Sequence, residues 1–168
     1  MWTSRLAAIL TRELRALARE LQAYPNDEAL WRTLPGMPNS AGTLALHLAG
    51  NLQHYIGARL GGSGYRRDRA AEFARRHVPR PTLLEEIGRA IAAVESTVPG
   101  LGAELLEADY PEPVGGRRVR TDDFLLHLVA HLAWHLGQVD YHRRAVTGEA
   151  GAIGAVAASE LSSARPAR

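Results

Sequence analysis

The chain has 168 residues, of which 46% are hydrophobic and 23% are charged, and its formal net charge is +2. This length fits one domain, whose core can form without covalent cross-links. The sequence contains no cysteine and no lysine, which excludes disulfides, thiolate metal sites, a cysteine nucleophile and Schiff-base chemistry. Seven histidines remain as the main reactive groups, together with carboxylates, hydroxyls and arginines.

The absence of long apolar segments and of strongly basic segments indicates the cellular compartment and excludes some classes of partner. No stretch resembles a signal peptide or approaches the ~18–20 apolar residues of a membrane span. We therefore expect a cytoplasmic protein with no membrane contact. A net charge of +2 is small, so we expect no nucleic-acid partner.

Apolar residues at helical spacing predict two helices in the first third of the chain. The first runs from residue 3 or 4 to about residue 23 and ends at Pro25. A stiff connector, Leu34–Pro38, follows it. The second helix begins after Ser40, a suitable N-cap, and runs to about residue 60, where two glycines end it.

A loop is predicted over residues 61–81, which are rich in glycine, arginine and proline. Thr82 and Glu85 form a capping box that starts a third helix, and Pro99 breaks that helix. One or two further helical turns are predicted over residues 101–106.

An irregular connection with a short hairpin is predicted over residues 109–120, which contain two prolines and a Gly-Gly pair. The last helix starts with Thr121 or Asp122 as its N-cap, runs to about residue 146 and ends before Gly148.

Four amphipathic helices without strand alternation predict an all-α fold, a four-helix bundle over residues 1–147. Residues 148–168 are rich in alanine, glycine and serine, and we expect a loosely ordered, flexible tail there. The connections between the helices exceed the usual two to eight residues, so a simple up-down topology is not implied.

Histidines form a ridge on the last predicted helix. His127, His131 and His135 are spaced four residues apart and fan over about 80° of one face. Gln138 and His142 fall in the same sector. A single histidine on an apolar face is usually structural, but such a run is costly to bury unless the ring nitrogens find partners, and a metal ion provides one.

Helical spacing limits which histidines can share one ion. Histidines four apart lie about 6 Å apart along the axis and can both reach an ion, whereas His127 and His135 are separated by roughly 12 Å. The pair is therefore either His127 with His131 or His131 with His135. A third ligand must come from another helix, where His47 and His54 are the two alternatives.

The sequence HLVAHLAWHLGQVDYHRR in the last helix and LHLAGNLQHYIGARLGG in the second resemble the DinB/YfiT-like metal-dependent enzymes over roughly residues 5–147. The resemblance implies a four-helix bundle with three histidines on one divalent ion, often as a homodimer. Carried over, the histidine of HLAGN is His47, and the two histidines before Gly-Gln are His131 and His135. Zinc or nickel is the expected ion, with iron or manganese as alternatives.

Polar neighbours of these histidines are candidates for orienting the imidazole rings, namely Asn51, His127 and Gln138. Ordinary polar packing between helices is the alternative interpretation of these side chains. The arginine-rich segment 64–80 offers Arg66, Arg67 and Arg69 as candidates for binding a carboxylate or phosphate of a substrate. A solvated surface is the plainer interpretation of that segment.

Two functions of different classes are consistent with these patterns. The first is a metal-dependent enzyme acting on a small molecule, either a thiol-dependent S-transferase or a hydrolase. Characterised relatives in the family that the sequence resembles include thiol-dependent S-transferases and isomerases that use a small intracellular thiol, and the absence of cysteine means that any thiol comes from a cosubstrate. No glutamate follows His131, so a zincin-type peptidase is not indicated. The second is a non-catalytic, dimeric bundle used in interactions or stress responses, with a structural metal or none.

Overall fold

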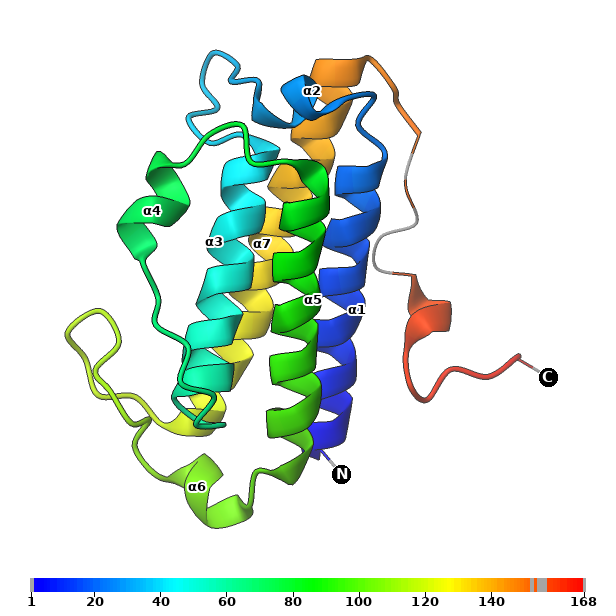
Figure 1. Cartoon of the computed structure of the whole chain (residues 1–168). Helices are drawn as coiled ribbons and strands as arrows, with labels where there is room; N and C mark the ends of the chain where they lie inside the picture. Colours follow the sequence, from blue (N-terminus) through cyan, green and yellow to red (C-terminus); the bar gives the residue numbers. More distant parts are fainter. Residues whose placement is uncertain (1, 152, 154–156, 168) are drawn as a thin grey trace.

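The computed structural model describes residues 2–151, 153 and 157–167. Four long helices form the body of the molecule (Figure 1): α1 Trp2–Gln22, α3 Ala41–Leu52, α5 Arg80–Thr97 and α7 Thr121–Thr147. The shorter segments are α2 Asp27–Trp31, the π-helical η1 Gln53–Ala58, α4 Arg69–Ala74, the 3₁₀ turn η2 Val98–Gly100, α6 Ala103–Glu107 and the 3₁₀ turn η3 Ala158–Glu160. The described part of the chain contains isolated β-bridges but no strand. The prediction of an all-α helical bundle is confirmed.

The helices are not arranged as a sequential up-down ring. α1 packs against α5 and α7, and α3 packs against the same two helices, so α1 and α3 lie on a diagonal. In Figure 1, α1 and α7 run upwards, whereas α3 and α5 run downwards. The chain must therefore return along the length of α3 before α5 can begin, and the segment 61–79 makes this return.

The core consists of the apolar stripes that the sequence predicts. On α1 the leucines at positions 10, 14, 17 and 21 are fully buried, and on α7 the residues Leu125, Leu128, Leu132, Leu136 and Val139 are at most 2% exposed. This aliphatic stripe fixes the rotation of α7 about its axis. The histidine ridge beside it consequently faces the groove between α7 and α3.

Two predicted helix ends are confirmed. The Ser40 hydroxyl accepts a hydrogen bond from the Thr43 amide at 3.2 Å, as an N-cap does. At the C-terminal end of α7, Gly148 adopts φ 76°, the left-handed conformation of a helix C-cap. Its amide donates to the Arg144 carbonyl.

Two predicted helix starts are wrong. α5 begins two residues before Thr82, with Pro79 at its N-cap position and no capping side chain, so Thr82 and Glu85 do not form a capping box. Pro81 lies in the first turn of α5, where an amide hydrogen would have no partner. A proline is therefore tolerated there, and the helix begins before it. α7 begins at Thr121 with Arg120 at its N-cap position, so neither Thr121 nor Asp122 is the cap, and the Thr121 hydroxyl donates instead to the Ala108 carbonyl at 3.1 Å.

The predicted loop over residues 61–81 contains the helix α4, which corrects that prediction. Asp68 caps α4 by accepting a hydrogen bond from the Ala71 amide at 2.8 Å. α4 packs against α3 (Figure 1). Helix periodicity is not detectable over a single turn and a half, which explains why the sequence pattern gave no signal.

The connection 109–120 forms the predicted short hairpin. Isolated bridges pair Asp109 with Arg120 and Val114 with Arg117. Gly115 and Gly116 both have positive φ, 56° and 75°, as the two central residues of a type I′ turn require.

We expected residues 148–168 to form a loosely ordered tail. Of these, residues 152, 154–156 and 168 lie outside the described residues. In the described part of the tail, Glu160 of η3 pairs with Arg19 of α1 at 3.4 Å. None of the helices in the described part of the chain combines the length and apolar character that a bilayer span requires.

Candidate metal centre

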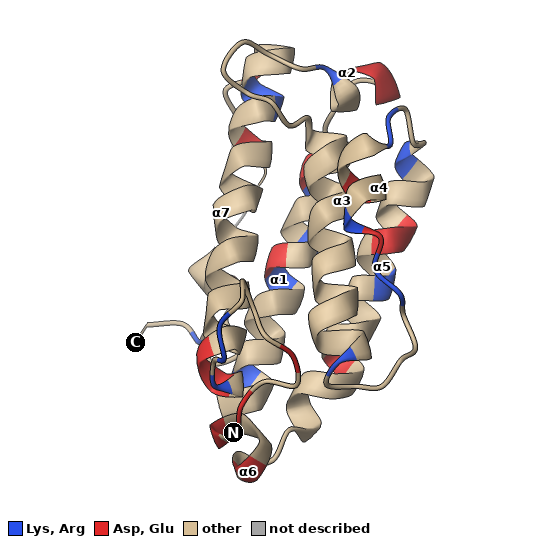
Figure 2. Ribbon diagram, turned by 90° about the vertical axis from the view of Figure 1, so that its left-hand side faces the viewer, with Lys and Arg blue, Asp and Glu red and all other residues tan. Residues whose placement is uncertain are grey.

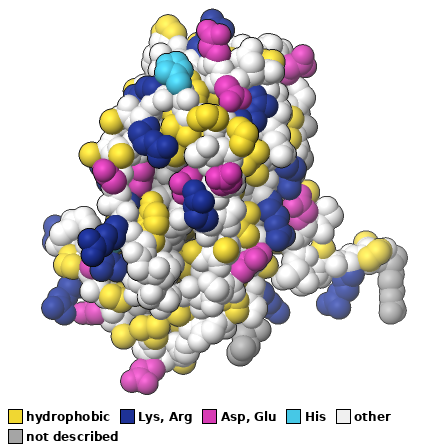
Figure 3. Space-filling model, in the orientation of Figure 1, with side chains coloured by type: hydrophobic (Ala, Val, Ile, Leu, Met, Phe, Trp, Pro, Cys, Tyr) yellow, Lys and Arg dark blue, Asp and Glu magenta, His cyan; other side chains and the backbone are white. Residues whose placement is uncertain are grey.

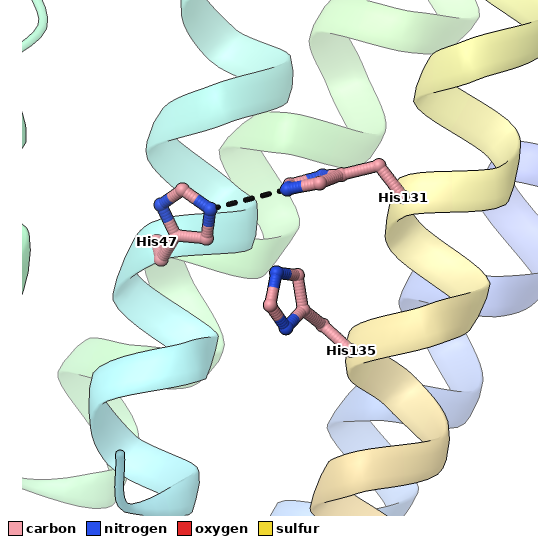
Figure 4. A group of neighbouring side chains, drawn as sticks. All are labelled: His47, His131 and His135. Atoms are coloured by element: carbon pink, nitrogen blue, oxygen red, sulfur yellow. Dashed lines mark hydrogen bonds between the residues drawn. The ribbon is translucent and has the colours of Figure 1, made fainter. Parts of the chain in front are cut away.

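Three histidines from two helices meet between α3 and α7. His47 lies in the middle of α3, and His131 and His135 lie one turn apart on α7 (Figure 4). The Nε2 atoms of His47 and His131 are 3.3 Å apart, and one nitrogen from each ring lies within 4.8 Å of the other two. The structure therefore brings together the three histidines that the family resemblance implied.

The spacing of these nitrogens fits a tetrahedral ion. At a Zn–N distance of ~2.0–2.1 Å, two tetrahedral ligand nitrogens lie roughly 3.3–3.4 Å apart, and no two ligands can be more than about 4.2 Å apart. The His47–His131 separation of 3.3 Å already meets this requirement. A separation at the 4.8 Å limit of the group would have to shorten by roughly 1.4 Å, through rotation of the imidazole rings, to reach the tetrahedral spacing. Three imidazoles are also a donor set that zinc and nickel accept.

His47 is held by a buried carboxylate from α4. Its Nδ1 lies 3.1 Å from Oε2 of Glu72, and both side chains are only 7% exposed. Arg67 donates two hydrogen bonds to the same carboxylate, at 2.7 and 2.8 Å. Burial raises the pKa of Glu72, but the hydrogen bonds from Arg67 and His47 outweigh this effect and leave the pKa below its ordinary value. An ionised Glu72 accepts from Nδ1–H and leaves the Nε2 lone pair of His47 free for a metal.

Gly50 makes this contact possible. A Cβ atom at position 50 would lie 2.2 Å from Oε1 of Glu72, closer than any real side-chain contact. The missing side chain lets the carboxylate lie directly on α3, one turn below His47. Phe73 of α4 completes the packing, with its ring centroid 4.9 Å from that of His47.

The two α7 histidines are also prepared for ligation. Nδ1 of His135 lies 2.7 Å from Oε1 of Gln138, which can only accept, so the hydrogen sits on Nδ1 and Nε2 is free. Burial lowers the pKa of His131 to about 4, with smaller contributions from His135 and His47. Burial lowers the pKa of His135 as well, against the opposing effect of the hydrogen bond that His135 donates to Gln138.

A comparison with protein-family models matches the DinB superfamily over residues 9–139. The match covers most of the chain and includes all three clustered histidines. The chain belongs to the DinB superfamily. No curated protein and no solved structure matches it. Membership confirms the family resemblance seen in the sequence, and the three-histidine group of this DinB-superfamily chain can hold a metal ion.

The remaining histidines on α7 and η1 have other contacts in this DinB-superfamily bundle. His54 lies in the π-helical segment, and its Nε2 is 2.8 Å from Glu112 of the hairpin connection. His142 is buried between the Tyr24 hydroxyl and the Arg32 carbonyl, each at 2.7 Å from a ring nitrogen. Both of its nitrogens are thus used in holding α7 to the α1–α3 connection, which is a structural role.

The candidate orienting residues differ in what they contact. Gln138 bonds His135, as described above. His127 is exposed, and its ring stacks on that of His131 at a centroid distance of 6.0 Å without a hydrogen bond to any of the three clustered histidines. Asn51 is buried, and among the described residues its Oδ1 has no hydrogen-bond partner. Roles for Asn51 and His127 at the metal stay predictions.

The three candidate substrate-binding arginines also differ in their exposure and contacts. Arg67 is 9% exposed and bonded to Glu72, and its Nη2 lies 3.2 Å from Nδ1 of His47, so its guanidinium belongs to the histidine support. Arg66 is exposed, and Arg69 is exposed and stacks over the Phe73 ring at 5.0 Å. Recognition of an acidic substrate by these side chains stays a prediction.

Glu72 is the functional residue that the sequence pattern did not predict. It appears in the sequence as one acidic residue among many arginines. Its position depends on the return path of the chain along α3. The one signal in the sequence is Gly50, a residue one turn from His47 whose missing side chain permits close contact with α3.

Weakening the Glu72 contact is expected to lower metal affinity. Glu72→Gln keeps an acceptor but loses the charge, and Glu72→Ala loses both, so affinity should fall in that order, by about 10–100-fold for alanine. Gly50→Ala should act in the same direction because its Cβ displaces the carboxylate. Zinc affinity can be measured by competition with a chromophoric chelator.

Glu112→Gln is a matched control, because Glu112 bonds His54 and Arg59 in a similar arrangement outside the cluster. We expect it to leave zinc affinity unchanged. Equal affinities for wild type, Glu72→Gln and Glu72→Ala would show that Glu72 supports only the packing of α4.

Proposed function

We propose that this chain is a metal-dependent enzyme acting on a small molecule, with His47, His131 and His135 as the ligands of one divalent ion. The observation that carries the proposal is the convergence of three imidazoles, two of which have their second nitrogen occupied by a hydrogen-bond partner. Such orienting partners are typical of metal-binding histidines. Zinc or nickel fits the all-nitrogen donor set, and iron or manganese is an alternative.

Three protein ligands favour a catalytic over a purely structural site. Structural zinc sites are closed by four protein ligands, whereas catalytic sites keep a position for water or substrate. When bound, a divalent ion polarises a carbonyl or lowers the pKa of a water or thiol. The chain's own contribution is to hold the ring of His47 in place through Glu72 and Arg67, and the ring of His135 through Gln138.

The proposed reaction is transfer of a small thiol to an electrophile, with hydrolysis of a small molecule as the second possibility. In the transfer, a carbon–sulfur bond forms, the bond to the leaving group breaks, and the thiol proton passes to the leaving group. Because the chain contains no cysteine, the thiol is a cosubstrate. Positive and negative side chains are interleaved on the face shown in Figure 3, which is not the basic stripe that a nucleic acid would favour.

A thiol-dependence screen tests this function. Untagged, zinc-loaded protein is incubated with a panel of electrophiles and esters, with and without a low-molecular-weight thiol. We expect turnover that requires metal and is lost in His131→Ala. Thiol-dependent turnover would establish the transferase, thiol-independent turnover would establish the hydrolase, and no turnover in the presence of bound zinc would favour the non-catalytic alternative.

For the protein partner, we propose a second copy of the chain packed on the outer face of α7. Residues 124–139 carry no charged side chain, and most of the length of α7 is uncharged in Figure 2. Leu126, Trp134 and Tyr141 are 51%, 70% and 70% exposed and share the face opposite the core stripe. A contiguous exposed apolar surface of this kind marks an interaction site.

Trp134→Arg is expected to convert the dimer to a monomer, because a charge would be buried at the centre of this face. Sedimentation velocity measures the change. Leu105→Arg, on α6, is the control and should leave the dimer intact. A wild-type monomer at micromolar concentration would contradict the proposed partner.

A further inference from the structure

A cavity of about 260 Å³ lies against His135, where the α2–α3 connection approaches α7. Its walls combine apolar and uncharged polar side chains, from the α2–α3 connection, α3 and α7: Met37, Asn39, Leu44, His135, Gln138, Tyr141 and His142. His135 thus belongs both to the three-histidine group and to the cavity wall.

None of the described residues that line the cavity is an aspartate, a glutamate or an arginine. His142 lines it but offers no free nitrogen, because its two nitrogens are bonded to Tyr24 and the Arg32 carbonyl. Oε1 of Gln138 is likewise bonded to His135. A charged group entering this space would meet no side chain of opposite charge to offset the hydration that it loses.

We propose that this cavity is the substrate subsite of the metal centre and takes an uncharged, largely apolar group of about the size of one substituted aromatic ring. The proposal rests on the proposed function for the identity of the reacting end of the substrate. An apolar cavity of ~150 Å³ is enough to hold benzene, so 260 Å³ leaves room for a substituent that reaches the histidine cluster.

This assignment differs from the acidic substrate that the arginine-rich segment suggested. The guanidinium of Arg67 is already bonded to the Glu72 carboxylate. Specificity in the cavity comes instead from shape and from the cost of burying charge.

Fluorine NMR of two ring compounds tests the cavity in the metal-free protein. We expect saturable binding of para-fluorotoluene and at least about tenfold weaker binding of para-fluorobenzoate, since the cavity holds no cation for the carboxylate. Met37→Asp places a carboxylate on the wall and should weaken para-fluorotoluene binding by about tenfold or more. Leu105→Asp is the matched control because Leu105 and Met37 are both 37% exposed, and it should leave binding unchanged.

The link to the metal centre is tested in zinc-loaded protein. Para-fluorobenzyl mercaptan should bind at least about tenfold more tightly than para-fluorotoluene, because its thiol reaches the histidine cluster. Equal binding of the two compounds would overturn the subsite, as would tight para-fluorobenzoate binding to the metal-free protein or insensitivity to Met37→Asp. Failure to bind zinc at all would defeat the proposed function, a result distinct from the para-fluorotoluene measurement.

Discussion

Replacing His131 with alanine is expected to weaken zinc binding by about 10²–10³-fold. The free energy of ~10–16 kcal/mol for a four-ligand zinc site corresponds to roughly 2.5–4 kcal/mol per ligand, which is the share lost with one imidazole. His131 faces both other histidines of the cluster, with its ring centroid 5.2 Å from that of His47 and 4.7 Å from that of His135. Isothermal titration calorimetry of the untagged protein with zinc measures the change.

His127→Ala is the control for that experiment. His127 lies one turn from His131 on the same helix and stacks on it, but it is outside the three-histidine group. We expect His127→Ala to lower zinc affinity far less than His131→Ala does, since His127 stacks on the ring of His131 but supplies no nitrogen to the group. A strong loss in His127→Ala combined with no loss in His135→Ala would mean that the other histidine pair on α7 binds the ion.

Arg143→Ala is expected to cause the largest loss of stability of any single substitution considered. Arg143 and Glu20 form an ion pair at 2.6 Å and are 2% and 0% exposed. Removing the arginine leaves a buried carboxylate whose Oε1 already has no partner among the described residues, which costs about 3–5 kcal/mol at neutral pH. Urea unfolding followed by circular dichroism measures the free energy of unfolding.

The loss of stability caused by Arg143→Ala is expected to depend on pH. Burial raises the pKa of Glu20 above 4.5, against opposing contributions from Arg143. A carboxyl with a raised pKa in the folded state contributes stability below its unfolded pKa and loses it as pH rises. The deficit of Arg143→Ala should therefore narrow as pH falls towards 4.5, because a protonated Glu20 carries no charge.

Arg144→Ala is the matched control for the buried pair. Arg144 pairs with Asp140 at 3.0 Å and is 33% exposed, so its loss should cost no more than about 1 kcal/mol. Equal costs for the two substitutions would mean that the Glu20–Arg143 pair contributes no more than a surface ion pair.

The sequence predicted the helices well because their signals are local. Leucines at helical spacing, the hydroxyl of Ser40 and the left-handed Gly148 each depend only on neighbouring residues. Capping residues were predicted less well, since Thr121 uses its hydroxyl to bond Ala108, a contact across thirteen positions that no local pattern contains.

The site could be predicted only as far as helical geometry reaches. Four-residue spacing identified the α7 histidines as possible ligands but could not choose between the two pairs, and the family resemblance pointed to His131 and His135. The support from Glu72 and Arg67 was not predicted because it depends on where the segment 61–79 runs. Gln138 was predicted, because it lies on the same helix face as the ligand that it orients.

The metal centre is tested most directly by X-ray absorption spectroscopy of the zinc-loaded protein. The geometry predicts three imidazole nitrogens at about 2.0–2.1 Å and one further light ligand. A shell made mostly of oxygen ligands, or one with fewer than three imidazoles, would contradict ligation by His47, His131 and His135.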